Sequence, residues 1–121
     1  MENSFEVKNA KCGEIQIISP CGYLDAHTAP ELENAIRTAI DAGEKFLLVD
    51  FESLDYISSA GLGVFMAFIE DIREIGGDIK MSSLKQKVYA VFDLLGFPIL
   101  FDILPTKQEG IAKFDELIAK P

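Results

Sequence analysis

The amino-acid sequence predicts an α/β fold: a small mixed β-sheet of about five strands flanked by about four helices. Short apolar segments alternate along the chain with longer segments whose apolar residues recur at helical spacing, which is the pattern of an α/β domain. The run over residues 45–51 is almost continuously apolar, as in a strand covered on both faces. With 121 residues, 49% of them hydrophobic, the chain can bury one core, so residues 1–121 are expected to form a single domain.

The first third of the chain predicts two strands and a helix. Residues 5–10 and 13–23 are expected to pair as a hairpin around residues 11–13, since apolar and polar side chains alternate there. Residues 28–31 have the T-x-x-E pattern of a capping box, with a proline in the first turn. Gly43 is expected to end the helix. Its core-facing residues, at helical spacing, are Leu32, Ala35, Ile36, Ala39 and Ile40.

The middle of the chain predicts a strand over residues 45–51, an acidic turn over residues 52–57 and a helix that begins at Ser58 or Ser59. Open parallel sheets place ligand and control sites beyond the carboxyl ends of their strands, so this junction is the first candidate for a functional site. The helix is expected to end at the glycine pair 76–77. Its core-facing line is Leu62, Phe65, Met66, Ile69 and Ile72.

The last third predicts two strands and two helices. Residues 78–82 are β-compatible, and residues 83–86 form a second capping box before Leu84, Val88, Val91, Phe92 and Leu95. After Gly96, residues 97–101 are predicted to form a short edge strand, where a proline is tolerated. Residues 106–109 form a third capping box, and the core-facing residues of the final helix are Ile111, Phe114, Leu117 and Ile118.

The charge and composition exclude several classes of function. A net charge of -9 and a pI near 4.5 disfavour nucleic acid and membrane surfaces as partners and favour a folded protein with basic patches. The first residues lack the features of a signal peptide, and the longest apolar stretch, residues 60–69, is too short to span a bilayer, so a cytoplasmic location is expected. Cys12, Cys21 and His27 cannot complete a set of metal ligands, so reduced thiols, no metal and no cofactor are expected.

The helix at Ser58 and Ser59 differs from the other three predicted helices because no Glu or Gln follows three residues later. Its first acidic residue is Glu70, which leaves the positive end of the helix dipole open to an anion, including a phosphate on one of its own serines. The alternative is that a serine merely caps the helix. The acidic residues expected around this end are Asp25, Asp50, Glu52 and Asp55.

The same helix has a second apolar line, formed by Val64, Phe68 and Ile75 and rotated away from the core-facing line. If these residues are exposed, they make an apolar docking strip beside the serines. If a neighbouring helix covers them, they belong to the core. The periodicity alone leaves both alternatives open.

Two segments resemble the anti-sigma factor antagonist family, the stand-alone STAS domains of bacteria. Residues 22–29 (GYLDAHTA) are similar to the family's G-x-L-D-x-x-T-A turn, and residues 48–51 (LVDF) with 55–63 (DYISSAGLG) to its strand and phosphoacceptor loop. The resemblance implies that Ser59 is the phosphoacceptor. Ser58 is the less favoured alternative. Many family members have Asp at the position of Ser58, so the alignment with the family motif still allows Ser58 as the acceptor. Partner-binding residues are then expected at Asp25, Thr28, Asp55, Ser58, Gly61, Val64 and Phe68.

The family's mechanism implies the partners. The unphosphorylated form would bind an anti-sigma factor that is also a serine kinase and so release a sigma factor. Phosphorylation would end the binding, and a metal-dependent PP2C-type serine phosphatase would reset the cycle. The chain is expected to be a monomer with no catalysis of its own. The alternative within the family is a scaffold or interaction module in a stress-signalling or lipid-transport complex.

Two other classes of function are weaker. A hydrolase with Ser59 as nucleophile would need a glycine at position 57, where this chain has Ile57, and a base, for which His27 is the one histidine. An aspartyl-phosphate receiver with Asp50 as acceptor would need an acidic pair after its first strand and a lysine late in the fold, neither of which can be placed. No P-loop or dinucleotide-binding fingerprint is present.

Overall fold

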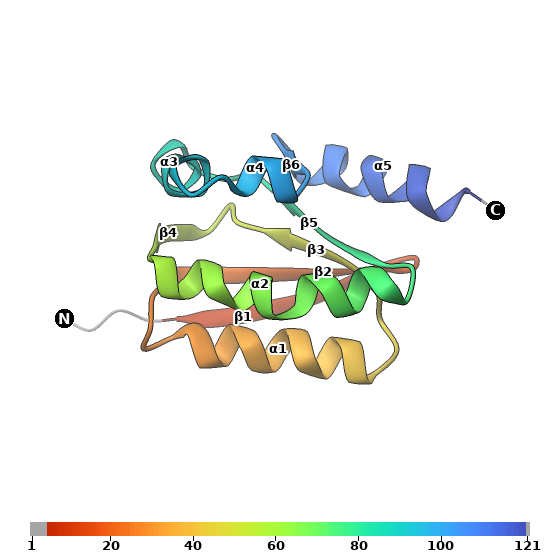
Figure 1. The fold of residues 1–121 in the computed structure, drawn as a ribbon, viewed down its shortest axis with the longest axis horizontal. Coiled ribbons are helices and arrows are strands. Elements are labelled where there is room, and N and C mark those ends of the chain that lie inside the picture. The colour runs from red at the N-terminus through yellow and green to blue at the C-terminus, as the bar shows by residue number, and fades with distance from the viewer. Residues whose placement is uncertain (1–4, 121) are drawn as a thin grey trace.

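The computed structural model describes residues 5–120, which form six strands and five helices (Figure 1). In chain order these are β1 (Glu6–Cys12), β2 (Ile15–Leu24), α1 (Ala29–Asp41), β3 (Phe46–Asp50), β4 (Leu54–Ile57), α2 (Ser59–Glu74), β5 (Asp78–Ser82), α3 (Gln86–Leu94), α4 (Phe97–Leu100), β6 (Ile103–Leu104) and α5 (Lys107–Ile118). The predicted α/β class is confirmed.

The strands form one mixed sheet in the order β1-β2-β3-β5-β6. β1 is antiparallel to β2 and lies at one edge, whereas β2, β3, β5 and β6 are parallel to one another. β4 lies outside this order and pairs in parallel with the last residues of β2. The antiparallel hairpin at the edge is therefore the reason that the sheet is mixed, as predicted.

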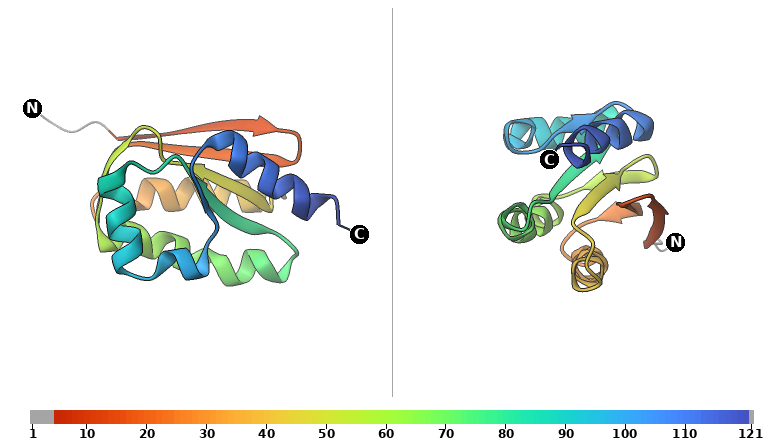
Figure 2. Two further views of the ribbon diagram at one scale, coloured as in Figure 1. Left: turned by 90° about the horizontal axis from the view of Figure 1, so that it is seen from above. Right: turned by 90° about the vertical axis from the view of Figure 1, so that its right-hand side faces the viewer.

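The two faces of the sheet are covered unequally (Figure 2). The larger core lies under α1, α2, α3 and α4 and includes the central strand residues Leu47 and Val49. On the opposite face a smaller cluster packs under α5 and consists of Ile15, Ile17, Phe46, Leu48 and Phe114. Within residues 5–120, no helix is both long and apolar enough to cross a bilayer.

The predicted edge strand over residues 97–101 is wrong. Gly96 adopts a left-handed conformation (φ 78°), and the chain then turns into α4, with Pro98 in its first turn and Phe101 N–H donating to the Phe97 carbonyl. Proline fixes a helical φ and suits the first turn, which favours this short helix. The edge strand is β6, where Ile103 and Leu104 pair with β5.

The predicted acidic turn over residues 52–57 is also partly wrong, since residues 54–57 form β4. Only residues 51–53 turn, and the Leu54 N–H donates to the Phe51 carbonyl. The four residues of β4 alternate imperfectly, with buried Leu54 and Ile57 around the more exposed pair 55–56. A strand this short carries too little periodicity to be recognised, and its pairing with β2 is a long-range contact.

Two of the three predicted capping boxes do not form. Thr28 precedes α1 but makes no cap hydrogen bond to the helix. α3 begins at Gln86, after Lys85, while Ser83 lies outside the helix with a positive φ of 65°. The sequence predicts a contrast between α2, which has no capping box, and three helices that are expected to have one. Because only one of those three boxes forms, this contrast is weaker than expected.

The third capping box forms at α5. The Thr106 hydroxyl accepts a hydrogen bond from the Glu109 N–H at 3.1 Å, and Thr106 Oγ1 lies 3.2 Å from Glu109 Oε1. We expect Thr106→Ala to lower the free energy of unfolding by about 1 kcal/mol in urea denaturation, because one helix N–H loses its partner. Thr38→Ala, in the exposed interior of α1, is the control and is expected to change it by less than about 0.5 kcal/mol. Equal effects of the two substitutions would contradict the prediction.

Candidate functional site

The candidate site lies where β2 and β4 end side by side, at the start of α2. Tyr23 pairs with Tyr56 and Leu24 with Ile57 in the parallel register. Beyond the last pair, the Ser58 N–H donates to the Leu24 carbonyl at 2.9 Å. This bond holds the residues that follow β2 beside the first residues of α2, so the two segments with family resemblance meet at one edge of the sheet.

The two serines have different environments. Ser58 is the N-cap of α2: its backbone is extended, its side chain is half-buried, and its hydroxyl accepts a hydrogen bond from the Gly61 N–H at 3.4 Å. Ser59 is the first residue of the helix and is exposed, and its hydroxyl makes no hydrogen bond to another residue within 5–120. The first turn of α2 contains no acidic side chain. The exposed hydroxyl thus stands at the positive end of a 16-residue helix.

Asp25 and Thr28 form a closed turn after β2. Asp25 Oδ1 accepts hydrogen bonds from the His27 and Thr28 N–H groups at 2.9 and 3.1 Å. The Thr28 hydroxyl donates to the Tyr23 carbonyl at 2.8 Å and accepts from the Asp25 N–H at 3.0 Å. The Thr28 hydroxyl is therefore engaged within the turn and does not cap α1, which explains why the predicted capping box does not form.

Of the acidic residues expected around the helix end, Asp50 is not at the surface. Its side chain is 5% exposed and accepts a hydrogen bond from the Ser82 hydroxyl at 2.9 Å. The parallel pairing of Asp50 with Ser82 places both residues inside the sheet, so the expectation for Asp50 is wrong. Its burial also removes the aspartyl-phosphate alternative, which needs an accessible acceptor.

Asp55 is paired with Lys85 at the start of α3. The hydrogen bond from Lys85 and its charge hold the pKa of the Asp55 carboxyl below its usual range. Lys85 therefore partly neutralises Asp55. Both side chains remain well exposed, so the pair contributes little to stability.

Val64 and Phe68 do not form an exposed docking strip. They are only 5% and 7% exposed and belong to the larger core, and the Arg37 guanidinium of α1 lies over the Phe68 ring at 5.2 Å. The alternative that a neighbouring helix covers the line is confirmed for Val64 and Phe68, and their assignment as partner-binding residues is wrong. Ile75, the third residue of the line, is the C-cap of α2 and is 55% exposed. The helix is rotated so that Met66, expected in the core, is 46% exposed. α2 packs against both the sheet and α1, and this second neighbour widens its buried face.

Gly61 is buried where α2 crosses the ends of β2 and β4. A Cβ atom at this position would lie 2.8 Å from Leu24 Cγ and 3.2 Å from Ile57 Cγ1. Gly61 therefore acts through close packing, and this packing sets the position of the Ser59 helix on the strands.

We expect Gly61→Ala to lower the free energy of unfolding by about 1–2 kcal/mol, because an added methyl group overpacks this contact. Gly63→Ala is the matched control in the same helix, since nothing lies within 4 Å of its Cβ position. It should raise the free energy of unfolding by about 0.5–1 kcal/mol, as alanine favours a helix over glycine. Urea denaturation of both variants tests the pair, and a stabilising Gly61→Ala would contradict it.

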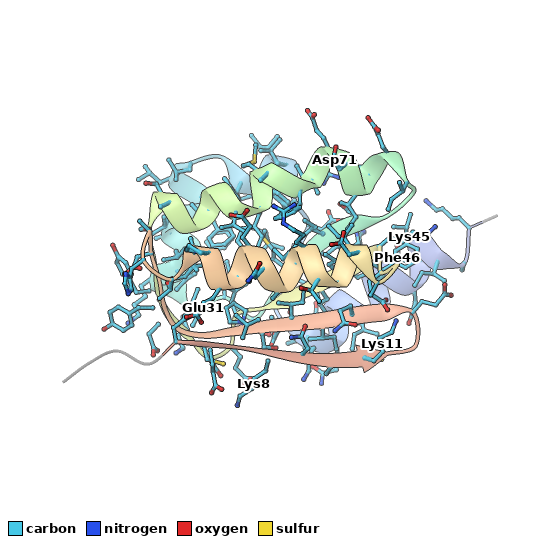
Figure 3. All side chains as sticks on the ribbon, turned by 90° about the horizontal axis from the view of Figure 1, so that it is seen from below. Lys8, Lys11, Glu31, Lys45, Phe46 and Asp71 are labelled. Carbon is cyan, nitrogen blue, oxygen red and sulfur yellow. The ribbon has the colours of Figure 1, made fainter. Side chains whose placement is uncertain are left out.

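A hollow with a volume of about 540 Å³ lies elsewhere on the surface, between α1 and the β1–β2 hairpin. Figure 3 shows its two sides, with Glu31 on α1 facing the strand that carries Lys8 and Lys11. The lining includes the amides of Asn9, Gln16 and Asn34. None of the predicted site residues lines this cleft.

Two exposed aromatic residues at the site have no counterpart among the predicted site residues. Tyr23 and Tyr56 are 41% and 48% exposed, and their ring centroids lie 5.6 Å apart. Each tyrosine directly precedes the apolar residue that ends its strand. This shared position could be recognised in the sequence only if β4 were known to be a strand.

Known proteins resemble this chain in sequence and in fold. The family model described as the STAS domain matches residues 7–110. A protein of Bordetella bronchiseptica named as an anti-sigma factor antagonist, BtrV, is 32% identical over 93 residues, which cover 77% of this chain and 80% of BtrV. The solved structure of the anti-sigma factor antagonist SpoIIAA in its unphosphorylated form superposes with a TM-score of 0.77 at 23% identity, covering 93% of this chain and 97% of SpoIIAA. Phosphorylated SpoIIAA of Bacillus gives a TM-score of 0.68 at 22% identity, with 92% and 99% covered.

Proposed function

Because this chain belongs to the STAS domain family, we propose that it is an anti-sigma factor antagonist whose binding is switched by phosphorylation of Ser59. In the unphosphorylated form it binds an anti-sigma factor with serine kinase activity and thereby releases a sigma factor. The kinase phosphorylates Ser59 and so ends the complex, and a PP2C-type phosphatase restores it. The chain is the substrate of both enzymes and performs no catalysis.

One observation carries the choice of Ser59: it is exposed in the first turn of α2, which contains no acidic side chain, whereas the neighbouring Ser58 hydroxyl is engaged as the cap. An enzyme can reach Ser59 without unfolding α2. A phosphate on Ser59 would meet the positive end of the helix dipole, which favours an anion. The acceptor therefore tolerates the modification without a change of fold.

The switch acts through the surface around Ser59. A phosphate adds about -1.5 to -2 charges beside the turn that contains Asp25, which the Ser58–Leu24 hydrogen bond holds next to the start of α2, and it replaces a small hydroxyl by a bulky group. A partner that packs closely on the helix start would lose a hydrogen bond and meet a larger, strongly hydrated group. We infer that binding ends by direct obstruction at the interface.

The test uses the purified chain, an anti-sigma factor kinase of the same organism and ATP. Mass spectrometry should find one added phosphate on Ser59, as a hydroxylamine-resistant phosphoester. Ser59→Ala should bind the kinase like the unmodified chain and accept no phosphate, whereas Ser59→Asp should weaken binding by at least about a hundredfold, or roughly 2.7 kcal/mol. Ser58→Ala is the matched control and should still be phosphorylated.

Two results would count against this function. A phosphate found on Ser58 and absent from Ser59 would move the acceptor to the cap residue. Binding to the kinase that is the same for Ser59→Ala, Ser59→Asp and the unmodified chain would show that the interaction is not switched here, as for a scaffold module. Calorimetry with each variant separates these outcomes.

A further inference from the structure

Tyr23 and Tyr56 form an exposed aromatic pair on neighbouring strands, next to the Ser59 helix. Their rings are tilted by 31° at a centroid separation of 5.6 Å, and nearly half of each residue is open to solvent. Tyr56 is three residues before Ser59, and the Tyr23 carbonyl accepts a hydrogen bond from the Thr28 hydroxyl in the turn after β2. The pair is thus held rigidly by the same strands that position the proposed phosphoacceptor.

The pair lies on the part of the sheet that α5 leaves open. Residues of β2 with odd numbers face α5, as Ile15 and Ile17 do, and Tyr23 continues this face. On β2 the buried cluster under α5 includes Ile15 and Ile17, whereas Tyr23 and Tyr56 are 41% and 48% exposed. Leu24 and Ile57, the next residues, point to the opposite face and into the larger core.

The acidic residues near the pair differ in how far lysines neutralise them. The Gly22 N–H donates to the Ser53 carbonyl and so brings the turn after β3 next to Gly22, but Glu52 in this turn lines a hollow together with Lys85 and Lys107. Asp55, next to Tyr56, is paired with Lys85. The carboxylates that remain near the pair are those of Asp25 and Glu6. Asp25 follows in the next turn, and Glu6 pairs with Cys21 on the same face. The first basic residue along β1 on this face, Lys8, pairs with Ser19, two positions further from the tyrosines.

Within residues 5–120, no lysine or arginine of the chain stacks on the Tyr23 or Tyr56 ring. The cation–π contacts within residues 5–120 all fall on phenylalanines, with Arg37 over Phe68 and Arg73 over Phe101 at 5.2 and 5.7 Å, and lysines over Phe46 and Phe114. Tyrosine faces next to carboxylates attract a guanidinium group, which stacks on aromatic rings and is more weakly hydrated than an ammonium group. The net charge of -9 adds a general preference for a basic partner.

From this juxtaposition we propose that the Tyr23–Tyr56 pair is a docking site for an arginine side chain of the partner protein. The guanidinium stacks on the exposed rings while the neighbouring carboxylates attract its charge. The inference rests on the proposed function, since it assigns a contact to the same partner, and it extends the interface from the Ser59 helix around the edge of the sheet to its open face.

The first experiment needs no partner and no variant. NMR of the unmodified chain follows the ring signals of Tyr23, Tyr56 and Tyr89 during titration with the peptide Gly-Arg-Gly-Arg or Gly-Lys-Gly-Lys. We expect the arginine peptide to shift the signals of Tyr23 and Tyr56 at least about threefold more than the lysine peptide does. Tyr89 on α3, 39% exposed, is the internal control and should not respond. Equal or absent shifts would overturn the proposal, and shifts that depend on protein concentration alone would identify a second copy of the chain as the occupant.

The second experiment measures binding of the anti-sigma factor kinase by calorimetry. Tyr23→Leu and Tyr56→Leu should each weaken binding about tenfold, Tyr→Phe at the same positions by less than about threefold, and Tyr89→Leu not at all. Leucine variants that bind like the unmodified chain, while Ser59→Asp still blocks binding, would overturn this inference and leave the proposed function standing. If the kinase binds no form of the chain but the arginine peptide still shifts both tyrosines, the proposed function fails and the arginine site remains.

Discussion

Phe51→Ala is expected to lower the free energy of unfolding by about 3–5 kcal/mol, because the side chain is fully buried and its loss leaves a cavity. The Phe51 ring packs edge-on against Phe65 of α2 and Phe92 of α3, with centroid distances of 5.9 and 5.4 Å. Phe51 also follows β3 directly and joins the sheet to the turn before β4. Removing it therefore weakens the support beneath the Ser59 helix as well as the core.

Urea denaturation followed by far-UV circular dichroism measures this loss. Phe51→Leu should retain part of the contact and lose less. Tyr89→Ala, which truncates an exposed ring on α3, should change the free energy of unfolding by less than about 1 kcal/mol. A Phe51→Ala variant as stable as the Tyr89→Ala variant would contradict the packing of the three rings.

Lys80→Met is expected to lower the free energy of unfolding by about 2–3 kcal/mol, because it removes a buried cation that binds two carboxylates, of which Asp102 is partly exposed. Lys80 is 5% exposed in β5, and its ammonium group lies 3.0 Å from Asp78 and 2.7 Å from Asp102. It also lies over the Phe114 ring at 5.1 Å. Methionine keeps the apolar part of the contact, so the loss reports on the charge. Asp102 loses the ammonium group that it binds, whereas Asp78 keeps its ion pair with Arg73.

The stability contributed by this cluster depends on pH in a predictable direction. The hydrogen bond from Lys80 lowers the pKa of Asp102, outweighing the effect of burial, so its contribution is present above the unfolded value of about 4 and is lost as pH falls through the lower, folded value. Burial alone would lower the pKa of Lys80, but the bonds to Asp102 and Asp78 raise it. That contribution is full below about 10.4 and is lost as pH rises through the higher, folded value.

The difference in unfolding free energy between Lys80→Met and the unmodified chain should therefore be larger at pH 7 than at pH 3. Urea titrations at both pH values measure it. Lys87→Met, an exposed lysine on α3, is the control and should show a small difference at both. A difference that is the same at pH 7 and pH 3 would show that Lys80 contributes by packing alone.

Much of the site could be predicted from local sequence. The serines at positions 58 and 59, the turn at Asp25 and Thr28, and Gly61 stand in two short segments, and the structure brings these segments together because β2 and β4 are neighbours. Thr28 was placed correctly at the turn but given the wrong hydrogen bond. Its T-x-x-E pattern is compatible with a capping box, and the bond to the Tyr23 carbonyl depends on how β2 ends.

The residues that sequence could not place depend on contacts between distant segments. Burial of Val64 and Phe68 depends on α1 lying against α2, and burial of Asp50 on the pairing of β3 with β5. The neutralising contact between Asp55 and Lys85 joins residues 30 positions apart. The exposure of Tyr23 and Tyr56 depends on α5 covering only part of its face of the sheet.

The sequence by itself determined the α/β class, the approximate positions of most elements and the two segments that make up the site. Periodicity, glycine stops and short motifs are local, so they can be recognised without knowledge of the fold. Only the tertiary structure decided that Ser58 is the engaged cap and Ser59 the exposed hydroxyl, and that Val64 and Phe68 are core while Ile75 of the same apolar line is exposed. It also decided that Tyr23 and Tyr56 are exposed beside the site. Whether a side chain is exposed depends on how the helices and strands pack against one another, and the local sequence pattern does not contain this information.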